Sequence, residues 1–182
     1  MKNSADRPAF RIAFCAAIAS LETVLMMVTG LTRVGTYAIP CFAGMLTIAI
    51  VIEYRSKWAF AVYAVTAILG FFLSGDKEAV VMFIAFFGYY PILKNILESR
   101  IRNKILLYLI KFAVFNAAAV GSFFVMMFVF SMPADEFTLF GVYIPYVFLI
   151  IGNVFFLLYD LAINVYVKFY VQRLRNALFG RK

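Results

Sequence analysis

The residues that could do chemistry in this chain are a few ionisable side chains set inside long apolar runs, namely Glu22, Lys111 and Asp160. Placing such a side chain inside a membrane costs roughly 2.5 to 3.5 kcal/mol, so each one needs a partner, a cavity or a function. The 182 residues include no histidine. Imidazole bases, histidine metal ligands and Ser-His-Asp or Cys-His catalysis are therefore excluded.

Lys111 and Asp160 are predicted to form a buried ion pair. Lys111 lies seven residues after Lys104, and Asp160 lies eight residues before Lys168. At about 1.5 Å per helical residue, both side chains fall about 10 to 12 Å into the membrane from the side on which Lys104 and Lys168 lie. The alternative is that Lys111 extends to the membrane interface while neighbours such as Asn164 satisfy Asp160.

Two amides and one tyrosine are further candidates. Asn116 and Asn153 both fall near the middle of the membrane, where they either hydrogen-bond across two helices or contact a ligand. Tyr146, Asn153 and Asp160 follow helical spacing, so they form one stripe that must face protein or water.

The first apolar run has two distinct faces. Ala13, Ala17 and Ser20 follow a spacing of four and three residues, which makes a flat strip where another helix can approach closely. Glu22 lies about 190° around the helix from that strip at 100° per residue. The residues predicted to share its face are Cys15, Ala19 and Met26.

No catalytic arrangement is visible. Intramembrane aspartyl proteases need two aspartates in one site, but Asp76 and Asp160 are predicted to lie on opposite sides of the bilayer. The chain has no phosphate-binding loop and no paired nucleophile and base. We expect no enzymatic activity, no cofactor and no metal site.

The elements that must position these residues are membrane helices. The composition is 65% apolar and only 14% charged, which is typical of a chain whose solvent is lipid. The apolar runs lack the period-two alternation of barrel strands, so helices are required. We predict one all-α, polytopic membrane domain over residues 1–182 with six spans, at approximately 12–28, 37–52, 58–73, 79–97, 105–132 and 139–167.

Lysine and arginine predict the orientation, because positive residues in short loops stay in the cytoplasm. Basic residues gather within 2–11, 55–57, 94–104 and 168–182, all on one side of a six-span chain, whereas only Arg33 and Lys77 fall on the other. We expect a cell-membrane protein with both termini cytoplasmic. Its net charge of +8 then indicates contact with anionic lipid in the bilayer, and no nucleic-acid partner.

The chain resembles an S component of the energy-coupling-factor (ECF) transporters, of an uncharacterised branch. The features that carry the resemblance are six predicted helices in about 180 residues, termini predicted to be cytoplasmic, a short basic N-terminus and Ala13-x-x-x-Ala17. The resemblance implies a protein that captures a vitamin or similar micronutrient from outside. It also implies a transmembrane coupling subunit and two ATPases as partners, with Ala13 and Ala17 docking that subunit and the loop of Arg33 helping to close the pocket. By depth and polarity, that pocket would draw on Glu22, Asn116, Tyr143, Tyr146 and Asn153.

The competing interpretation is a non-catalytic scaffold subunit of a bacterial cell-envelope complex. It requires the same topology and the same helix-docking strip. A pocket with convergent polar groups in the outer half would favour ligand binding, whereas polar residues paired with one another would favour a scaffold.

Overall fold

A computed structural model of the protein describes residues 8–32, 35–130, 138–139 and 142–175. Five helical runs within these residues are long and apolar enough to cross a membrane: Pro8–Thr32, Ala38–Leu73, Lys77–Arg100, Lys104–Phe128 and Leu149–Leu174. By helix length and hydropathy the chain is therefore a multi-pass membrane protein. The predicted all-α class is confirmed at this level.

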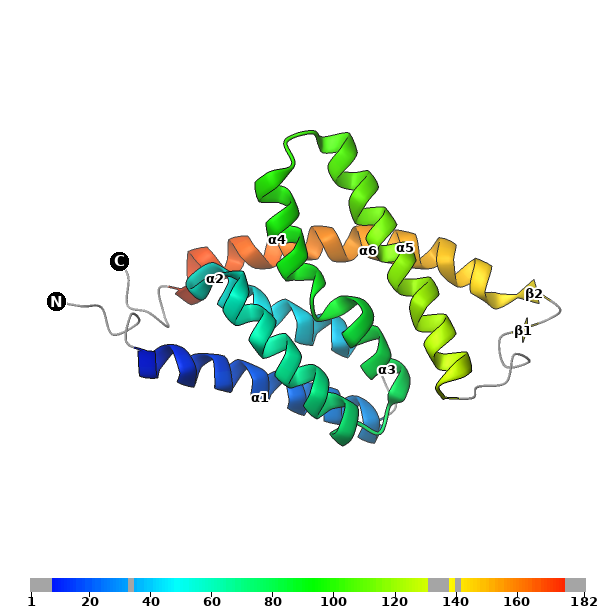
Figure 1. Cartoon of the computed structure of the whole chain (residues 1–182), viewed down its shortest axis with the longest axis horizontal. Coiled ribbons are helices and arrows are strands. Elements are labelled where there is room, and N and C mark those ends of the chain that lie inside the picture. The colour runs from blue at the N-terminus through cyan, green and yellow to red at the C-terminus, as the bar shows by residue number, and fades with distance from the viewer. Residues whose placement is uncertain (1–7, 33–34, 131–137, 140–141, 176–182) are drawn as a thin grey trace.

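The elements follow one another along the chain as Figure 1 labels them. Helix α1 spans Pro8–Thr32 and α2 spans Ala38–Leu73. The third apolar run consists of α3 (Lys77–Met82), the π-helix η2 (Phe83–Phe87) and α4 (Tyr90–Arg100). Helix α5 spans Lys104–Phe128, and the last run consists of α6 (Ile144–Phe169) and the π-helix η4 (Tyr170–Leu174).

Helix α2 reverses direction at Arg55. This residue has φ 69° and ψ 166°, which is not a helical conformation. Thr47 and Thr66 would lie about 28 Å apart in a continuous helix, yet both hydroxyls bind the carboxylate of Glu22 at 2.7 and 2.8 Å. The two halves of α2 therefore run back along each other, as the ribbon in Figure 1 shows.

The start of the last helix differs from the prediction. A helix was expected from residue 139, but Thr138–Leu139 (β1) and Val142–Tyr143 (β2) pair as antiparallel strands, and α6 begins at Ile144. Two strands joined by two residues form a β-hairpin. The hairpin satisfies backbone groups that a longer helix would have bonded internally.

The π-helix η2 is explained by the hydrogen bonds around it. Gly88 N donates to Phe83 O at 2.8 Å, which leaves the carbonyl of Ile84 free to accept from Tyr63 at 2.8 Å. Pro91 has no N–H to donate to the carbonyl of Phe87, and Tyr159 donates to that carbonyl at 3.2 Å. Two tyrosine hydroxyls thus replace backbone donors that the helix lacks.

The core lies around η2 and the first half of α2. The aromatic rings buried around η2 are Phe83, Phe86, Phe87, Tyr90, Phe115, Phe156 and Tyr159. A second buried cluster joins α1, both halves of α2 and α4 through Cys15, Ala19, Ile50, Val51, Ala59, Val62 and Ile92. The outward faces of α5 and α6 carry exposed apolar side chains such as Ile105 and Ile150, as expected of surfaces in contact with lipid.

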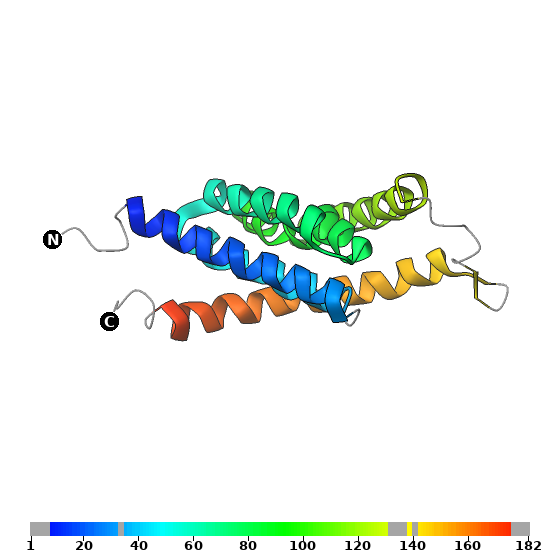
Figure 2. The same cartoon turned by 90° about the horizontal axis from the view of Figure 1, so that it is seen from below.

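The start of α1, the turn inside α2 and the end of η4 lie at the same end of the molecule in both views (Figures 1 and 2). We call this the basic end, because the turn carries Arg55 and Lys57 and the last helix ends near Arg173 and Arg175. The end of α1 and the connection between α2 and α3 lie away from the basic end, and β1 and β2 lie farther from it still (Figure 1).

Candidate functional site

Polar and charged side chains of α4, α5 and α6 form one group, which we call the Asp160 cluster: Tyr90, Lys94, Glu98, Lys111 and Asp160. Asp160 Oδ1 lies 2.6 Å from Lys94 Nζ, 3.0 Å from Lys111 Nζ and 2.6 Å from the hydroxyl of Tyr90. The side chains of both lysines and of Asp160 are at most 4% exposed. Glu98, whose side chain is 40% exposed, binds Lys94 at 3.3 Å and Lys111 at 2.7 Å.

The structure brings Lys111 and Asp160 together, as the matching depths predicted. Lys111 does not extend to the interface, because its side chain is only 2% exposed. Asn164 is exposed and is not among the groups that bind Asp160.

Sequence analysis missed Tyr90, Lys94 and Glu98, and it counted Lys94 only among the basic residues of the cytoplasmic side. A signal was available, since these three residues follow each other at spacings of four and so share one face of a helix. Two lysines now balance two carboxylates. The cluster joins α4, α5 and α6 without a net charge.

Glu22 lies in the core with none of its surface exposed. Its two carboxylate oxygens accept from Thr47 and Thr66, one hydroxyl from each half of α2. Among the described residues, no lysine or arginine forms an ion pair with it. The arrangement fastens the reversed halves of α2 to α1.

The two faces of α1 lie as the helical spacing predicted. The residues buried on the face of Glu22 include Cys15, Ala19 and Met26. Ala13, Ala17 and Ser20 are exposed on the other face. The flat strip is therefore available for contact outside this chain.

Asn116 and Asn153 bind each other. The side-chain amide of each donates to the carbonyl oxygen of the other, at 2.9 and 3.0 Å. Their remaining N–H groups donate to the backbone oxygens of Phe112 and Leu149, at 2.8 and 2.7 Å. All four amide hydrogens are thus used within α5 and α6, which is the interhelical alternative rather than ligand contact.

The remaining candidate residues lie outside what the structure describes. Arg33 lies outside the described residues. Tyr143 belongs to β2 and Tyr146 to α6 by backbone, but their side chains are not among those described. The role of these three residues in ligand binding stays a prediction.

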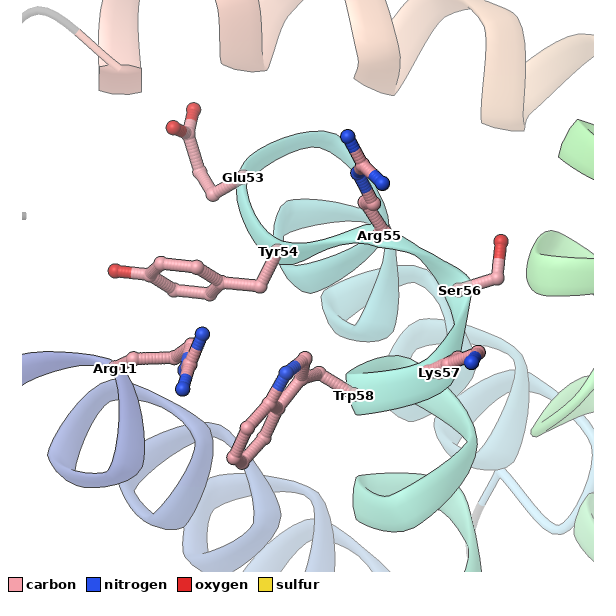
Figure 3. A pocket seen from close by; sticks show the side chains of 7 residues that line it. All are labelled: Arg11, Glu53, Tyr54, Arg55, Ser56, Lys57 and Trp58. Atoms are coloured by element: carbon pink, nitrogen blue, oxygen red, sulfur yellow. The ribbon is translucent and has the colours of Figure 1, made fainter. Parts of the chain in front are cut away.

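Two cavities of the described part of the chain bear on the candidate residues. One, of about 560 Å³, lies at the basic end and is lined by Arg11, Glu53, Tyr54, Arg55, Ser56, Lys57 and Trp58 (Figure 3). The other, of about 240 Å³, lies between α2, η2 and α5 and is lined almost entirely by apolar side chains, among them Phe71, Ile84 and Val125. Glu22, Asn116 and Asn153 line neither cavity.

Polar contacts join the end of α2 and the start of α3 to α1 and to the residues just before α2. Ser74 donates to the backbone oxygen of Met26 at 2.8 Å, and Thr36 donates to Asp76 Oδ2 at 2.9 Å. Tyr37 donates to the carboxylate of Glu78. Burial, followed by this hydrogen bond and the negative charge of Glu78, raises the pKa of Tyr37 above its usual value, so the phenol keeps its proton and remains a donor.

Within the described residues, no group of three or more His, Cys, Asp or Glu side chains is placed to hold a metal ion. The two free cysteines, Cys15 and Cys41, are both buried.

Comparisons with protein-family models, with curated proteins and with solved structures find no match to this chain. The likeness to S components therefore rests on the sequence features described above.

Proposed function

We propose that the protein is a six-span membrane subunit that docks to a partner protein through α1. The reversal of α2 at Arg55 supports six crossings, since each half has 17 or 18 residues, which is enough to span a locally thinned bilayer. The distribution of lysine and arginine supports cytoplasmic termini. The proposal assigns no catalytic activity to the chain.

The observation that carries this proposal is the division of α1 into two faces. One face is fixed in the core by Glu22, so the helix cannot rotate to hide the other. The outward face combines the small residues Ala13, Ala17 and Ser20 with exposed Leu21 and Val24. Small residues let a second backbone approach closely, which drives helix association in lipid.

The specific form of the proposal is an ECF-type substrate-binding subunit for uptake of a vitamin or similar micronutrient. A transmembrane coupling subunit would bind the strip on α1, and two partner ATPases would supply the energy. The proposed ligand contacts are Arg33, Tyr143 and Tyr146. Glu22, Asn116 and Asn153 would contact the ligand only if their present hydrogen bonds opened.

The second candidate is a non-catalytic scaffold subunit of a cell-envelope complex. It is favoured by the pairing of Asn116 with Asn153 and by the two threonines on Glu22. These polar side chains bind each other and line neither of the two cavities described above, which is the pattern expected of a scaffold.

The test is a mild-detergent pulldown of the tagged protein from its native membrane, with bound proteins identified by mass spectrometry. The variant is Ala13→Leu with Ala17→Leu. The matched control is Ala113→Leu with Ala117→Leu, because these residues are also exposed and four apart, but on α5.

Recovery of a transmembrane subunit and two ATPases by the wild type and the α5 control, but not by the α1 variant, would support the uptake subunit. Recovery of envelope-synthesis proteins with the same dependence on α1 would support the scaffold. Equal recovery by both double variants would contradict docking through α1.

A further inference from the structure

The cavity at the basic end is built from two segments that are far apart in the sequence. Arg11 reaches it from the first turn of α1, and the other lining residues come from the turn inside α2. Figure 3 shows the Arg11 side chain extending from α1 toward the rings of Tyr54 and Trp58. The cavity volume of about 560 Å³ exceeds what a few ordered waters occupy.

The lining carries an excess of positive charge. Arg11, Arg55 and Lys57 contribute three cations, and Glu53 is the only carboxylate among the lining residues. That carboxylate already has a partner, because Glu53 Oε1 lies 2.8 Å from Arg175 Nε and its side chain is 6% exposed. The three cations of the lining are therefore not balanced from within the cavity.

Arg11 is positioned as a receptor for an anion. Its guanidinium carbon lies 4.3 Å from the centre of the Trp58 ring, which holds the planar group in place. Its Nε is shielded from solvent and has no acceptor among the described residues. A shielded guanidinium N–H without an acceptor is costly, and a phosphate oxygen is the acceptor that the guanidinium fork fits best.

Arg55 is held in a strained conformation in the wall of the same cavity. Its φ of 69° with ψ of 166° falls in a region that is almost restricted to glycine. A glycine would make this turn without strain, and an arginine there costs stability. Such strain is concentrated where a side chain serves a binding site.

We propose that this cavity binds the phosphate group of an anionic ligand. The ligand is either the headgroup of an acidic phospholipid in the adjacent leaflet or free inorganic phosphate. Arg11 and Arg55 contact the phosphate oxygens, Lys57 adds attraction at the rim, and Trp58 and Tyr54 set the site at the depth where such rings meet lipid headgroups. The lining of this cavity shares no residue with the strip on α1 or with the residues proposed to contact a nutrient ligand.

The experiment uses the fluorescence of Trp58, the sole tryptophan of the chain. The purified protein in nanodiscs of phosphatidylcholine is given increasing amounts of phosphatidylglycerol that carries brominated acyl chains. Brominated phosphatidylcholine of the same chain length is the neutral comparison. A second series adds inorganic phosphate to the nanodiscs with brominated phosphatidylglycerol.

The variants are Arg11→Gln and Arg55→Gly, each compared with its own unquenched emission. Arg55→Gly relieves the backbone strain, so it keeps or raises the thermal stability while it removes a cation. Arg102→Gln is the matched control, because Arg102 is an exposed cation outside the cavity.

We expect brominated phosphatidylglycerol to quench Trp58 at a lower mole fraction than the neutral lipid. Each cavity variant should weaken this preference by about fivefold, and Arg102→Gln should leave it unchanged. Relief of quenching by inorganic phosphate would identify free phosphate as a ligand of the site, and its absence would identify the lipid headgroup.

Equal quenching by both lipids in the wild type, together with no effect of inorganic phosphate on it, would overturn the proposal. The proposal would also be overturned if the preference for phosphatidylglycerol survived in both cavity variants. The same holds if Arg102→Gln lowered this preference as much as the cavity variants do, because a diffuse surface charge would then explain the binding.

Discussion

Glu22 is a carboxyl group in an apolar core that two hydroxyls hold without a cation among the described residues. Substitution by Gln keeps the shape and an acceptor, and a threonine hydroxyl can accept from the new amide because it also has lone pairs. Substitution by Ala leaves a cavity and two threonines without their acceptor. We expect Glu22→Gln to stay within about 1 kcal/mol of the wild type and Glu22→Ala to lose about 2 to 5 kcal/mol.

The measurement is thermal unfolding in detergent, followed by a thiol-reactive dye that detects Cys15 and Cys41 as they become exposed. Ser20→Ala is the control on the same helix, since Ser20 is exposed and donates only to the backbone of Ala16. If Glu22→Gln lowered the thermal stability as much as Glu22→Ala, a carboxylate would be required at this position. The interpretation that a neutral acceptor of the two threonine hydroxyls is sufficient there would then be wrong.

Gly44 and Gly121 make opposite predictions for the same substitution. A Cβ on Gly44 would lie 2.1 Å from the backbone oxygen of Phe87, whereas a Cβ on Gly121 would meet nothing within 4 Å. Gly44→Ala must therefore push α2 away from η2 and disturb the hydroxyl of Tyr159, 3.1 Å from the same point. We expect it to lower the midpoint of thermal unfolding by an amount equivalent to about 1 to 3 kcal/mol.

Gly121→Ala should leave that midpoint unchanged or raise it by an amount equivalent to at most about 1 kcal/mol, because alanine favours the helix and nothing obstructs it. The same dye assay compares the two variants directly. Equal loss of stability in both would show that the effect comes from replacing a glycine in a membrane helix rather than from the contact with Phe87.

At the scale of elements, the Asp160 cluster is the polar contact that joins α4, α5 and α6. Asp160→Asn would leave Lys94 and Lys111 buried with only the half-exposed Glu98 to balance them. Breaking a buried pair by removing one partner costs about 3 to 5 kcal/mol. We expect a loss of that size in thermal unfolding, and we expect the double variant Asp160→Asn with Lys111→Met to recover part of it.

The partial recovery follows from charge, since the double variant leaves one lysine and one glutamate. Asn164→Ala is the control, because Asn164 is exposed on the same helix, and it should change stability by no more than about 0.5 kcal/mol. A double variant less stable than Asp160→Asn would indicate that Lys111 stabilises the helices through packing of its stem rather than through its charge.

The sequence predicted those features that depend on distance along one helix. The depth of Lys111 matched that of Asp160, and the face of Glu22 with Cys15 and Met26 followed from 100° per residue. The sequence could not assign Lys94 to Asp160, because that contact depends on how α4 is rotated against α6. Where a helix is apolar on every side, hydropathy does not encode its rotation.

The loop expected at residues 53–57 is where α2 reverses, although the strained conformation of Arg55 itself leaves no composition signal. Other short elements were missed for a different reason. The strands at 138–139 and 142–143 are two residues long, too short to show an alternating pattern. The π-helix at Phe83–Phe87 depends on Tyr63 and Tyr159, which are distant in sequence.

For the whole molecule, the decisive question is how many times the chain crosses the bilayer. If both halves of α2 cross, residues 57 and 102 lie on one side and residue 75 lies on the other, with the end of η4 back on the first side. If α2 does not divide into two crossings, residues 57 and 75 lie on the same side.

Single cysteines distinguish these arrangements in a background in which Cys15 and Cys41 are replaced by alanine. The positions are Lys57, Gly75, Arg102 and Arg173, which are all exposed. A membrane-impermeant maleimide added to intact cells should label only Gly75→Cys. The other three should react only after the membrane is opened, because the positive residues hold their end in the cytoplasm.

Labelling of Lys57→Cys in intact cells would refute the six-span topology. Labelling of Lys57→Cys, Arg102→Cys and Arg173→Cys but not of Gly75→Cys would instead invert the orientation, and the cavity of Arg11 and Arg55 would then face the opposite leaflet.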